Sequence, residues 1–244
     1  MKAMILCAGL GTRLRPWTLS HPKALVPVNG VPMLKRVVDE LSSQGFDEIV
    51  LNVHHFSSQI VAYVEEGNLD TRRILISDES EQLLDTGGGI LNAAPLLGSD
   101  GNPFLVHNVD ILSNADLKAL FESHVASHRD VTLLVSDRES DRRLVFDSNM
   151  VLKGWINMKT SEKRPASFEI AHDDRLLAFS GIYVMSVSVF DAMRRHGYEG
   201  KFPIMDFFLA GLPGVRIGGV CQEGLEILDI GKPDTLHRAN LLLQ

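Results

Sequence analysis

Short, continuously apolar runs alternate with amphipathic segments along the first half of the chain, and this alternation constrains the fold more than any other feature. The apolar runs are predicted strands, at residues 2–8, 48–53, 73–77 and 103–108. The segments between them are predicted helices, at residues 32–43, 58–66 and 89–97. Strands that are apolar throughout are buried on both faces, so the pattern predicts a mostly parallel sheet flanked by helices on both faces.

The second half of the chain begins in the same way and then changes. Between residues 137 and 174, charges alternate with short apolar pieces, which predicts a small antiparallel excursion beside the main sheet. The other predicted elements are helices at 117–127, 189–195, 206–210 and 234–243, and strands at 131–135 and 177–185. No linker divides the chain, so we expect one α/β domain over residues 1–244.

The charge balance and the cysteine content exclude several classes of protein. The chain carries a formal net charge of −7, so it lacks the broad cationic surface that collects nucleic acid, and an anionic ligand needs local cations. Cys7 and Cys221 lack the spacing of a zinc site or a disulfide framework, which favours a cytoplasmic setting. The first apolar run is too short for a membrane span and has no cleavage pattern of a signal peptide. We therefore expect no nucleic-acid partner and no membrane partner.

The loop after the first strand predicts a phosphate site. Gly9 and Gly11 allow backbone N–H groups to approach a bulky group, and Arg13 follows at once. Lys23 lies in a segment flanked by prolines, and with Arg13 it would neutralise a phosphate chain. A dinucleotide fingerprint is disfavoured, because Leu14 stands where its third glycine belongs. The alternative is a tight turn with solvated arginines.

Three consecutive glycines, residues 87–89, lie between the third strand and the next helix. Such a run is entropically costly unless the backbone must pass very close to a flat group, and a purine or pyrimidine ring would suit. The alternative is a flexible loop that leads into a helix.

Two aspartates, Asp110 and Asp229, each follow an apolar stretch where a strand ends. A carboxylate at such a position is costly without a cation partner. Mg²⁺ binds to one or two carboxylates, waters and phosphate oxygens, so these two residues are predicted to meet around one magnesium ion. For Asp229 alone, a turn or cap role is the alternative.

Taken in order, these stretches resemble the motifs of the nucleotide-sugar pyrophosphorylases, which join a nucleoside triphosphate to a sugar 1-phosphate. The matching stretches are residues 9–16, 22–28, 85–89, 108–110, 179–183 and 229–231. The resemblance is strongest to the N-acetylmuramate 1-phosphate uridylyltransferases and to the mannose- or heptose-1-phosphate guanylyltransferases, which favours UTP or GTP. It implies a Rossmann-like sheet, with a nucleotide-binding half at about 1–116 and a sugar-phosphate half at about 117–244.

The resemblance also implies roles for individual residues. Arg13 and Lys23 match the catalytic, phosphate-binding cations. The nucleotide would be bound by Ala8, Gly9, Gly11, Thr12, Arg13, Lys23, Asp85, Gly87, Gly88 and Asn108. The sugar phosphate would be bound by Glu169, Ser180 and Gly181, and Mg²⁺ by Asp110 and Asp229.

The implied reaction is displacement of pyrophosphate by an oxygen of the sugar 1-phosphate. Two other functions remain open: a cytidylyltransferase that acts on choline phosphate, and a non-catalytic sensor of nucleotide sugars. The expected partners are the two substrates, and the chain is expected to be a monomer or a homodimer.

Overall fold

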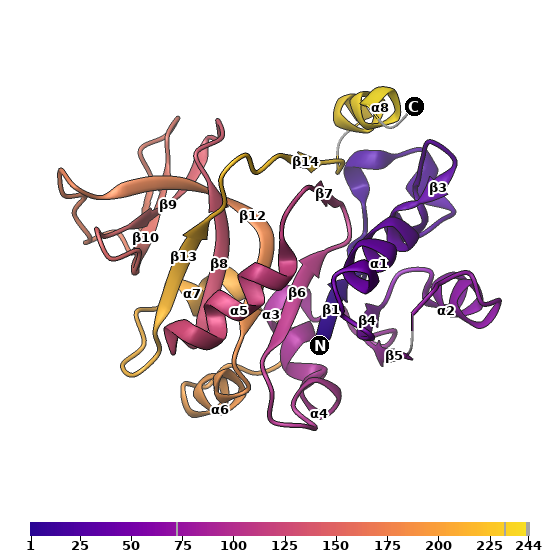
Figure 1. Cartoon of the computed structure of the whole chain (residues 1–244), viewed down its shortest axis with the longest axis horizontal. Helices are drawn as coiled ribbons and strands as arrows, with labels where there is room; N and C mark the ends of the chain where they lie inside the picture. The colour runs from indigo at the N-terminus through magenta and orange to yellow at the C-terminus, as the bar shows by residue number, and fades with distance from the viewer. Residues whose placement is uncertain (72, 232, 243–244) are drawn as a thin grey trace.

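One large mixed sheet runs through the computed structural model, which describes residues 1–71, 73–231 and 233–242 (Figure 1). Its strands are β1 (Lys2–Leu6), β4 (Glu48–Val53), β5 (Arg73–Asp78), β6 (Phe104–Asn108), β8 (Val131–Ser136), β9 (Arg142–Phe146), β10 (Leu152–Asn157), β11 (Lys163–Arg164), β12 (Arg175–Met185) and β13 (Ile217–Cys221). The strand order is β11-β10-β9-β12-β6-β1-β4-β5, and β8 pairs with both β12 and β13. The predicted α/β class is confirmed.

The strands of the amino-terminal half are parallel, as predicted. β1 lies between β4 and β6, so that Ile5 is level with Leu51 on one side and with His107 on the other. The carboxyl ends of these three strands therefore meet at one edge of the sheet. β12 runs antiparallel to β6 and to β8 and joins the parallel part of the sheet to the antiparallel strands.

Helices cover both faces of the sheet. One face carries α1 (Met33–Ser43), α2 (Ser57–Glu65) and α5 (Leu117–Ser127), and the other carries α3 (Asp85–Asn92), α4 (Ala94–Leu97), α6 (Ser188–Arg195) and α7 (Ile204–Phe208). In α1 the helical spacing predicted the core correctly, because Leu34, Val37, Val38 and Leu41 are fully buried. The sheet thus separates two apolar clusters, one on each side.

Two small sheets shape the edge where the parallel strands end. β2 (Pro27–Val28) pairs with β3 (Val31–Pro32), and β7 (Ile111–Ser113) pairs with β14 (Ile227–Asp229). β7 comes two residues after β6, so the second pair brings the carboxyl-terminal part of the chain back over the end of β6. α8 (Pro233–Leu242) follows and packs against β14 and β2.

Three outcomes refine the predicted elements. The antiparallel excursion is confirmed: β9, β10 and β11 form a lobe at the left of Figure 1. The helix predicted at 89–97 was wrong in its start, because α3 begins at Asp85 and contains all three glycines. The predicted closing helix corresponds to α8, and Leu243 lies outside the described residues. No helix in the described part of the chain is long and apolar enough to cross a membrane.

Candidate active site

A cavity of about 370 Å³, cavity A, lies at the edge where β1, β4 and β6 end. Ligands of open α/β sheets bind at this edge. Its lining consists of Leu6, Ala8, Gly9, Arg13, Lys23, Asn52, Leu83, Asp85, Thr86, Asn108, Asp110, Ile111 and Asp229. Eight of the residues predicted for the site are therefore gathered here, from segments far apart in the chain.

The loop after β1 folds back onto the segment that carries Lys23. Gly11 has a φ of +61°, and a Cβ there would lie 2.9 Å from both Lys23 Cβ and Thr18 Cγ2, so only glycine fits without displacing them. Thr18 Oγ1 donates a hydrogen bond of 2.8 Å to the Gly11 carbonyl. Gly9 has open space in front of its Cα, whereas Thr12 is exposed and does not line cavity A.

Lys23 and Asp110 form an ion pair inside cavity A. Lys23 Nζ contacts Asp110 Oδ2, and the two side chains are only 15% and 12% exposed. The Asp110 carbonyl accepts a hydrogen bond of 2.9 Å from Ile230 N, which fixes the end of β6 against the segment after β14. The ion pair neutralises a carboxylate that would otherwise be buried without a partner.

Asp229 and Arg13 point to the same small space as Asp110. A Cβ placed on Gly231 would lie 2.6 Å from Arg13 Nη2, 2.8 Å from Asp110 Oδ2 and 2.9 Å from Asp229 Oδ1. Among the described residues no three His, Cys, Asp or Glu side chains form a cluster that could hold a metal. A pair of carboxylates at the edge of a cavity could hold an ion that keeps several waters and takes substrate oxygens, which is the coordination that Mg²⁺ prefers.

A buried polar network below cavity A was missed by the sequence analysis. Asn52 Oδ1 accepts a hydrogen bond of 2.7 Å from Cys7 N, and Asn52 Nδ2 donates one of 2.8 Å to Glu79 Oε1. Glu79 Oε2 accepts a further bond of 3.2 Å from Leu84 N. Burial raises the pKa of Glu79. The network ties the start of the glycine loop to the start of α3. Its only signal in the sequence is one polar residue near the end of β4, Asn52, and another directly after β5, Glu79.

The three glycines of α3 face protein rather than cavity A. Gly87 N and Gly88 N donate hydrogen bonds of 2.9 and 3.1 Å to the Phe202 carbonyl. A Cβ on Gly87 would collide with the Phe202 ring, and one on Gly88 would collide with the Gly200 carbonyl. The predicted close approach is therefore to protein groups: Gly87 and Gly88 lie against the segment before α7, and Gly89 lies against Glu79. Asp85 and Thr86, which directly precede Gly87, line cavity A, and the assignment of Gly87 and Gly88 to the base stays a prediction.

A bulge in β12 carries two of the three residues predicted for the sugar phosphate, Ser180 and Gly181. Ser180 is buried, and its hydroxyl donates a hydrogen bond of 2.7 Å to the Leu134 carbonyl. Gly181 has a φ of +81°, and a Cβ there would lie 2.7 Å from Asn108 Nδ2, so Gly181 borders cavity A. Glu169 is exposed on the loop between β11 and β12, outside the lining of cavity A.

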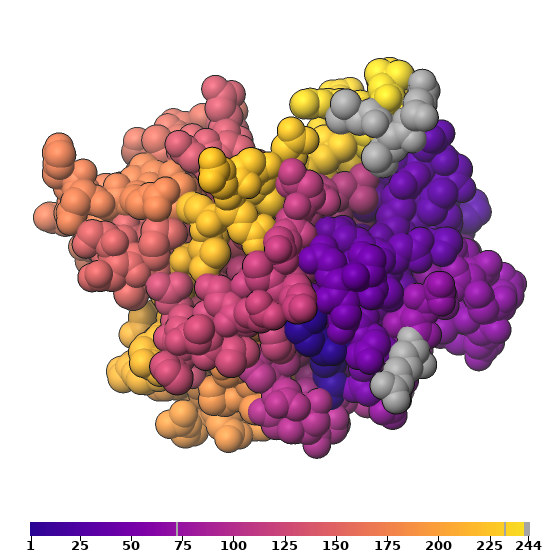
Figure 2. All heavy atoms as spheres, viewed as in Figure 1, coloured from indigo at the N-terminus to yellow at the C-terminus, as the bar shows by residue number. Residues whose placement is uncertain are grey.

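A second cavity, cavity B, of about 590 Å³, lies against the antiparallel lobe. It is lined by Arg138, Ser140, Arg142, Leu144, Trp155, Glu162, Arg164, Phe179, Pro203, Met205 and Leu209. Figure 2 shows a notch at the upper rim of the molecule between this lobe and the carboxyl-terminal segment. The three arginines of cavity B were not predicted, because they lie in the charged excursion without a recognisable motif.

Comparison with known proteins gives a consistent result. The family described as Nucleotidyl transferase matches residues 2–244. The chain is 41% identical to an N-acetylmuramate alpha-1-phosphate uridylyltransferase of Neisseria meningitidis serogroup B, over 99% of this chain and 98% of the relative. It is 39% identical to a mannose-1-phosphate guanyltransferase of Aspergillus oryzae, over 91% of this chain and 64% of the relative. The crystal structure of HddC from Yersinia pseudotuberculosis complexed with GMP-PN covers the whole chain with a TM-score of 0.78 at 24% identity, which supports the fold.

Proposed function

This chain belongs to the nucleotidyl transferase family, and we propose that it joins a nucleoside triphosphate to a sugar 1-phosphate and releases pyrophosphate. One observation carries the proposal: Arg13, Lys23, Asp110 and Asp229 converge on cavity A. A larger cavity, of about 650 Å³, opens beside Lys2 at the other ends of the strands and contains none of these four residues. Cavity A is therefore the proposed catalytic site.

The triphosphate would lie along the loop after β1. The open space at Gly9 lets the backbone come close to phosphate oxygens, and Arg13 supplies a guanidinium at the edge of the cavity. Lys23 would exchange its ion pair with Asp110 for a contact with phosphate, because a polyanion in cavity A competes for the ammonium. Uracil or guanine is the proposed base, because the relatives are a uridylyltransferase and a guanyltransferase.

Asp110 and Asp229 would hold the magnesium ion. Their carboxylate oxygens face one point and have no third acidic or histidine neighbour in the described part of the chain, which suits an ion that is also ligated by phosphate and water. When bound, the ion would neutralise charge on the phosphate oxygens of both substrates.

The chemical step needs alignment more than proton transfer. An oxygen of the sugar phosphate forms a bond to the α-phosphorus, and the bond from that phosphorus to the bridging oxygen of the leaving pyrophosphate breaks. The attacking group is already an anion at neutral pH, so no general base is required. Arg13 would stabilise the charge that builds on pyrophosphate, and Lys23 would reduce repulsion between the two substrates.

The sugar phosphate would approach from the β12 side. Gly181 supports this placement, because it borders Asn108 at the edge of cavity A. Ser180 would act by holding the bulge, since its hydroxyl is already bonded to Leu134. Glu169 is proposed to contact the sugar from the exposed loop. We also propose a nucleotide-binding half at about 1–116 and a sugar-phosphate half at about 117–244, and the place of Gly181 in β12 supports this division.

The test is a matrix of the four nucleoside triphosphates against hexose and heptose 1-phosphates, N-acetylmuramate 1-phosphate and choline phosphate, in the presence of Mg²⁺. We expect equimolar nucleotide sugar and pyrophosphate with UTP or GTP and one class of sugar phosphate. Nucleotide binding without pyrophosphate release would favour the sensor. Product from CTP and choline phosphate alone would favour the cytidylyltransferase.

A further inference from the structure

Arg138 stands out among the arginines of cavity B because its guanidinium is unpaired in charge and yet held in place. Arg164 pairs with Asp206 at 2.7 Å, whereas Arg138 and Arg142 form no ion pair within the described ranges. Of these two, Arg138 is the one whose guanidinium is anchored, because its Nη2 donates a hydrogen bond of 3.1 Å to the Phe179 carbonyl. That bond fixes the guanidinium and leaves other N–H groups available for a ligand.

The β12 bulge places Arg138 between the two cavities. Phe179, which accepts the hydrogen bond from Arg138, lines cavity B, and Gly181, two residues later, borders Asn108 of cavity A. Partial burial lowers the pKa of Arg138, and the negative charge of Asp229 opposes this shift. Arg138 therefore lies within electrostatic reach of the proposed metal ligand while it lines the neighbouring cavity.

The proposed reaction requires a doubly charged group at this junction. The phosphate of the sugar 1-phosphate must reach the α-phosphorus in cavity A, while the sugar remains on the β12 side. Asp110 and Asp229 are both acidic there, Arg13 is assigned to the triphosphate, and Lys23 is shared between the two substrates. An incoming phosphate therefore needs a further cation on its own side.

We propose that Arg138 binds the phosphate of the sugar 1-phosphate and thereby aligns it for attack, with the sugar seated in cavity B. This inference rests on the proposed function. A guanidinium donates two parallel hydrogen bonds to phosphate oxygens, which fixes orientation as well as charge. The half-buried faces of Trp155 and Phe179 give the sugar ring an apolar wall.

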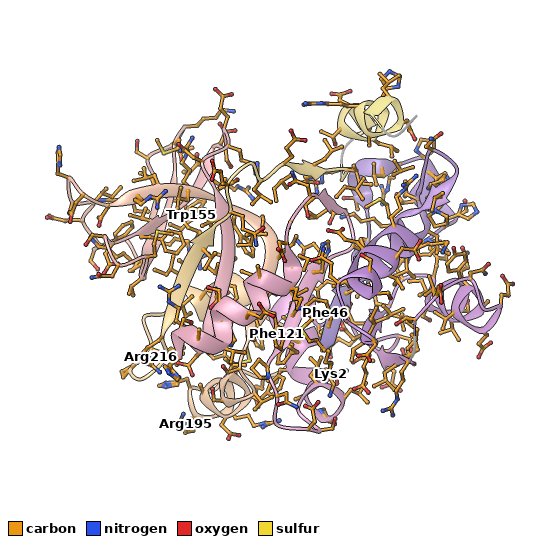
Figure 3. All side chains as sticks on the ribbon, viewed as in Figure 1. Lys2, Phe46, Phe121, Trp155, Arg195 and Arg216 are labelled. Atoms are coloured by element: carbon orange, nitrogen blue, oxygen red, sulfur yellow. The ribbon has the colours of Figure 1, made fainter. Side chains whose placement is uncertain are left out.

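The experiment compares Arg138→Met and Arg138→Lys with the wild-type protein, under conditions in which the wild type turns over. The matched control is Arg195→Met, an exposed arginine of α6 at the lower edge of the view, below the lobe that carries Trp155 (Figure 3). For Arg138→Met we expect the KM for the sugar 1-phosphate to rise on the order of 10–100-fold, because a charge-assisted contact with its phosphate is lost. The KM for the triphosphate should stay within about two-fold of wild type, because Arg138 is not proposed to contact the triphosphate.

The conservative variant and a binding measurement separate ligand binding from a structural role. Arg138→Lys should recover part of the affinity for the sugar 1-phosphate, because it restores the charge but not the paired donors. Inorganic phosphate should inhibit the wild type in competition with the sugar 1-phosphate, and inhibit Arg138→Met more weakly. An unchanged KM for the sugar 1-phosphate in a folded Arg138→Met protein, or equal increases for both substrates, would overturn the inference. Inactive wild-type protein would instead contradict the proposed function.

Discussion

Lys23 Nζ contacts Asp110 Oδ2 across 87 positions of sequence, and this ion pair joins the phosphate loop to the end of β6. Both partners are largely buried, so each depends on the other for neutralisation. In the proposed function the same two groups separate when substrates bind, Lys23 toward phosphate and Asp110 toward Mg²⁺. The ion pair therefore neutralises both groups and supplies both charges for the proposed reaction.

Replacing Asp110 should abolish turnover and retain the fold. Asp110→Ala removes a proposed ligand of Mg²⁺ and leaves the Lys23 ammonium without its partner at the rim of an open cavity. We expect nearly complete loss of pyrophosphate release, with cooperative thermal unfolding preserved. A variant with wild-type turnover would remove Asp110 from the mechanism.

Replacing Arg13 tests stabilisation of the leaving group. Arg13→Gln should lower kcat on the order of 10²–10³-fold, as does the loss of another preorganised electrostatic contact in a transition state. Arg15→Gln is the matched control, because Arg15 is exposed on the same loop and does not line cavity A. The measurement is kcat of both variants by steady-state kinetics. Equal effects of the two substitutions would argue against a specific role for Arg13.

The packing of the glycines of α3 predicts that substitution of Gly88 lowers the stability of the fold. Gly88→Ala places a Cβ against the Gly200 carbonyl, so it should lower the free energy of unfolding by about 1–3 kcal/mol. Gly9→Ala is the control, since no atom lies within 4 Å of a Cβ there, and its effect should stay within about 0.5 kcal/mol. Urea titration of both variants provides the comparison. An unchanged stability of Gly88→Ala would show that the segment before α7 moves aside easily.

Stability should decrease as the pH falls toward 4, partly because of His124. This imidazole is buried between Thr132 and Ser186, and burial lowers its pKa from 6.5 to about 4. Between these two values the unfolded chain binds the proton and the folded chain does not, so protonation favours unfolding. Between pH 7 and pH 5 the free energy of unfolding should therefore fall by about 1–2 kcal/mol less in His124→Gln than in the wild type, as measured by urea titration. If the free energy of unfolding changed with pH in the same way in wild type and in His124→Gln, His124 would not be a cause of the acid sensitivity.

The sequence was sufficient for the main sheet and for much of the active site. Apolar runs predicted β1, β4 and β6, and position after a parallel strand predicted Arg13 and Asp110 at the sheet edge. Lys23 and Asp229 line the same cavity, but they reach it from the turn after the glycine loop and from the antiparallel strand β14.

The missed features depend on contacts that sequence spacing does not encode. Glu79 and Asn52 meet only because β4 and β5 are neighbours in the sheet, and both lie against Gly89. Gly87 and Gly88 are explained by the segment that carries Gly200 and Phe202. Arg138 acquires its position from a bulge in β12, more than thirty residues later in the chain. These are tertiary contacts, so a strand or helix pattern gives no sign of them.

The central claim is that Asp110 and Asp229 act together on one ion and one pair of substrates, and a double-mutant cycle tests it most directly. The rate of pyrophosphate release would be measured for wild type, Asp110→Asn, Asp229→Asn and the double variant, at saturating substrates and Mg²⁺. The account predicts that the double variant is about as slow as the slower single variant, because either substitution already disables the shared site. The account would be contradicted if the fold-reduction in rate of the double variant equalled the product of the two single reductions. A wild-type rate in either single variant would also contradict it.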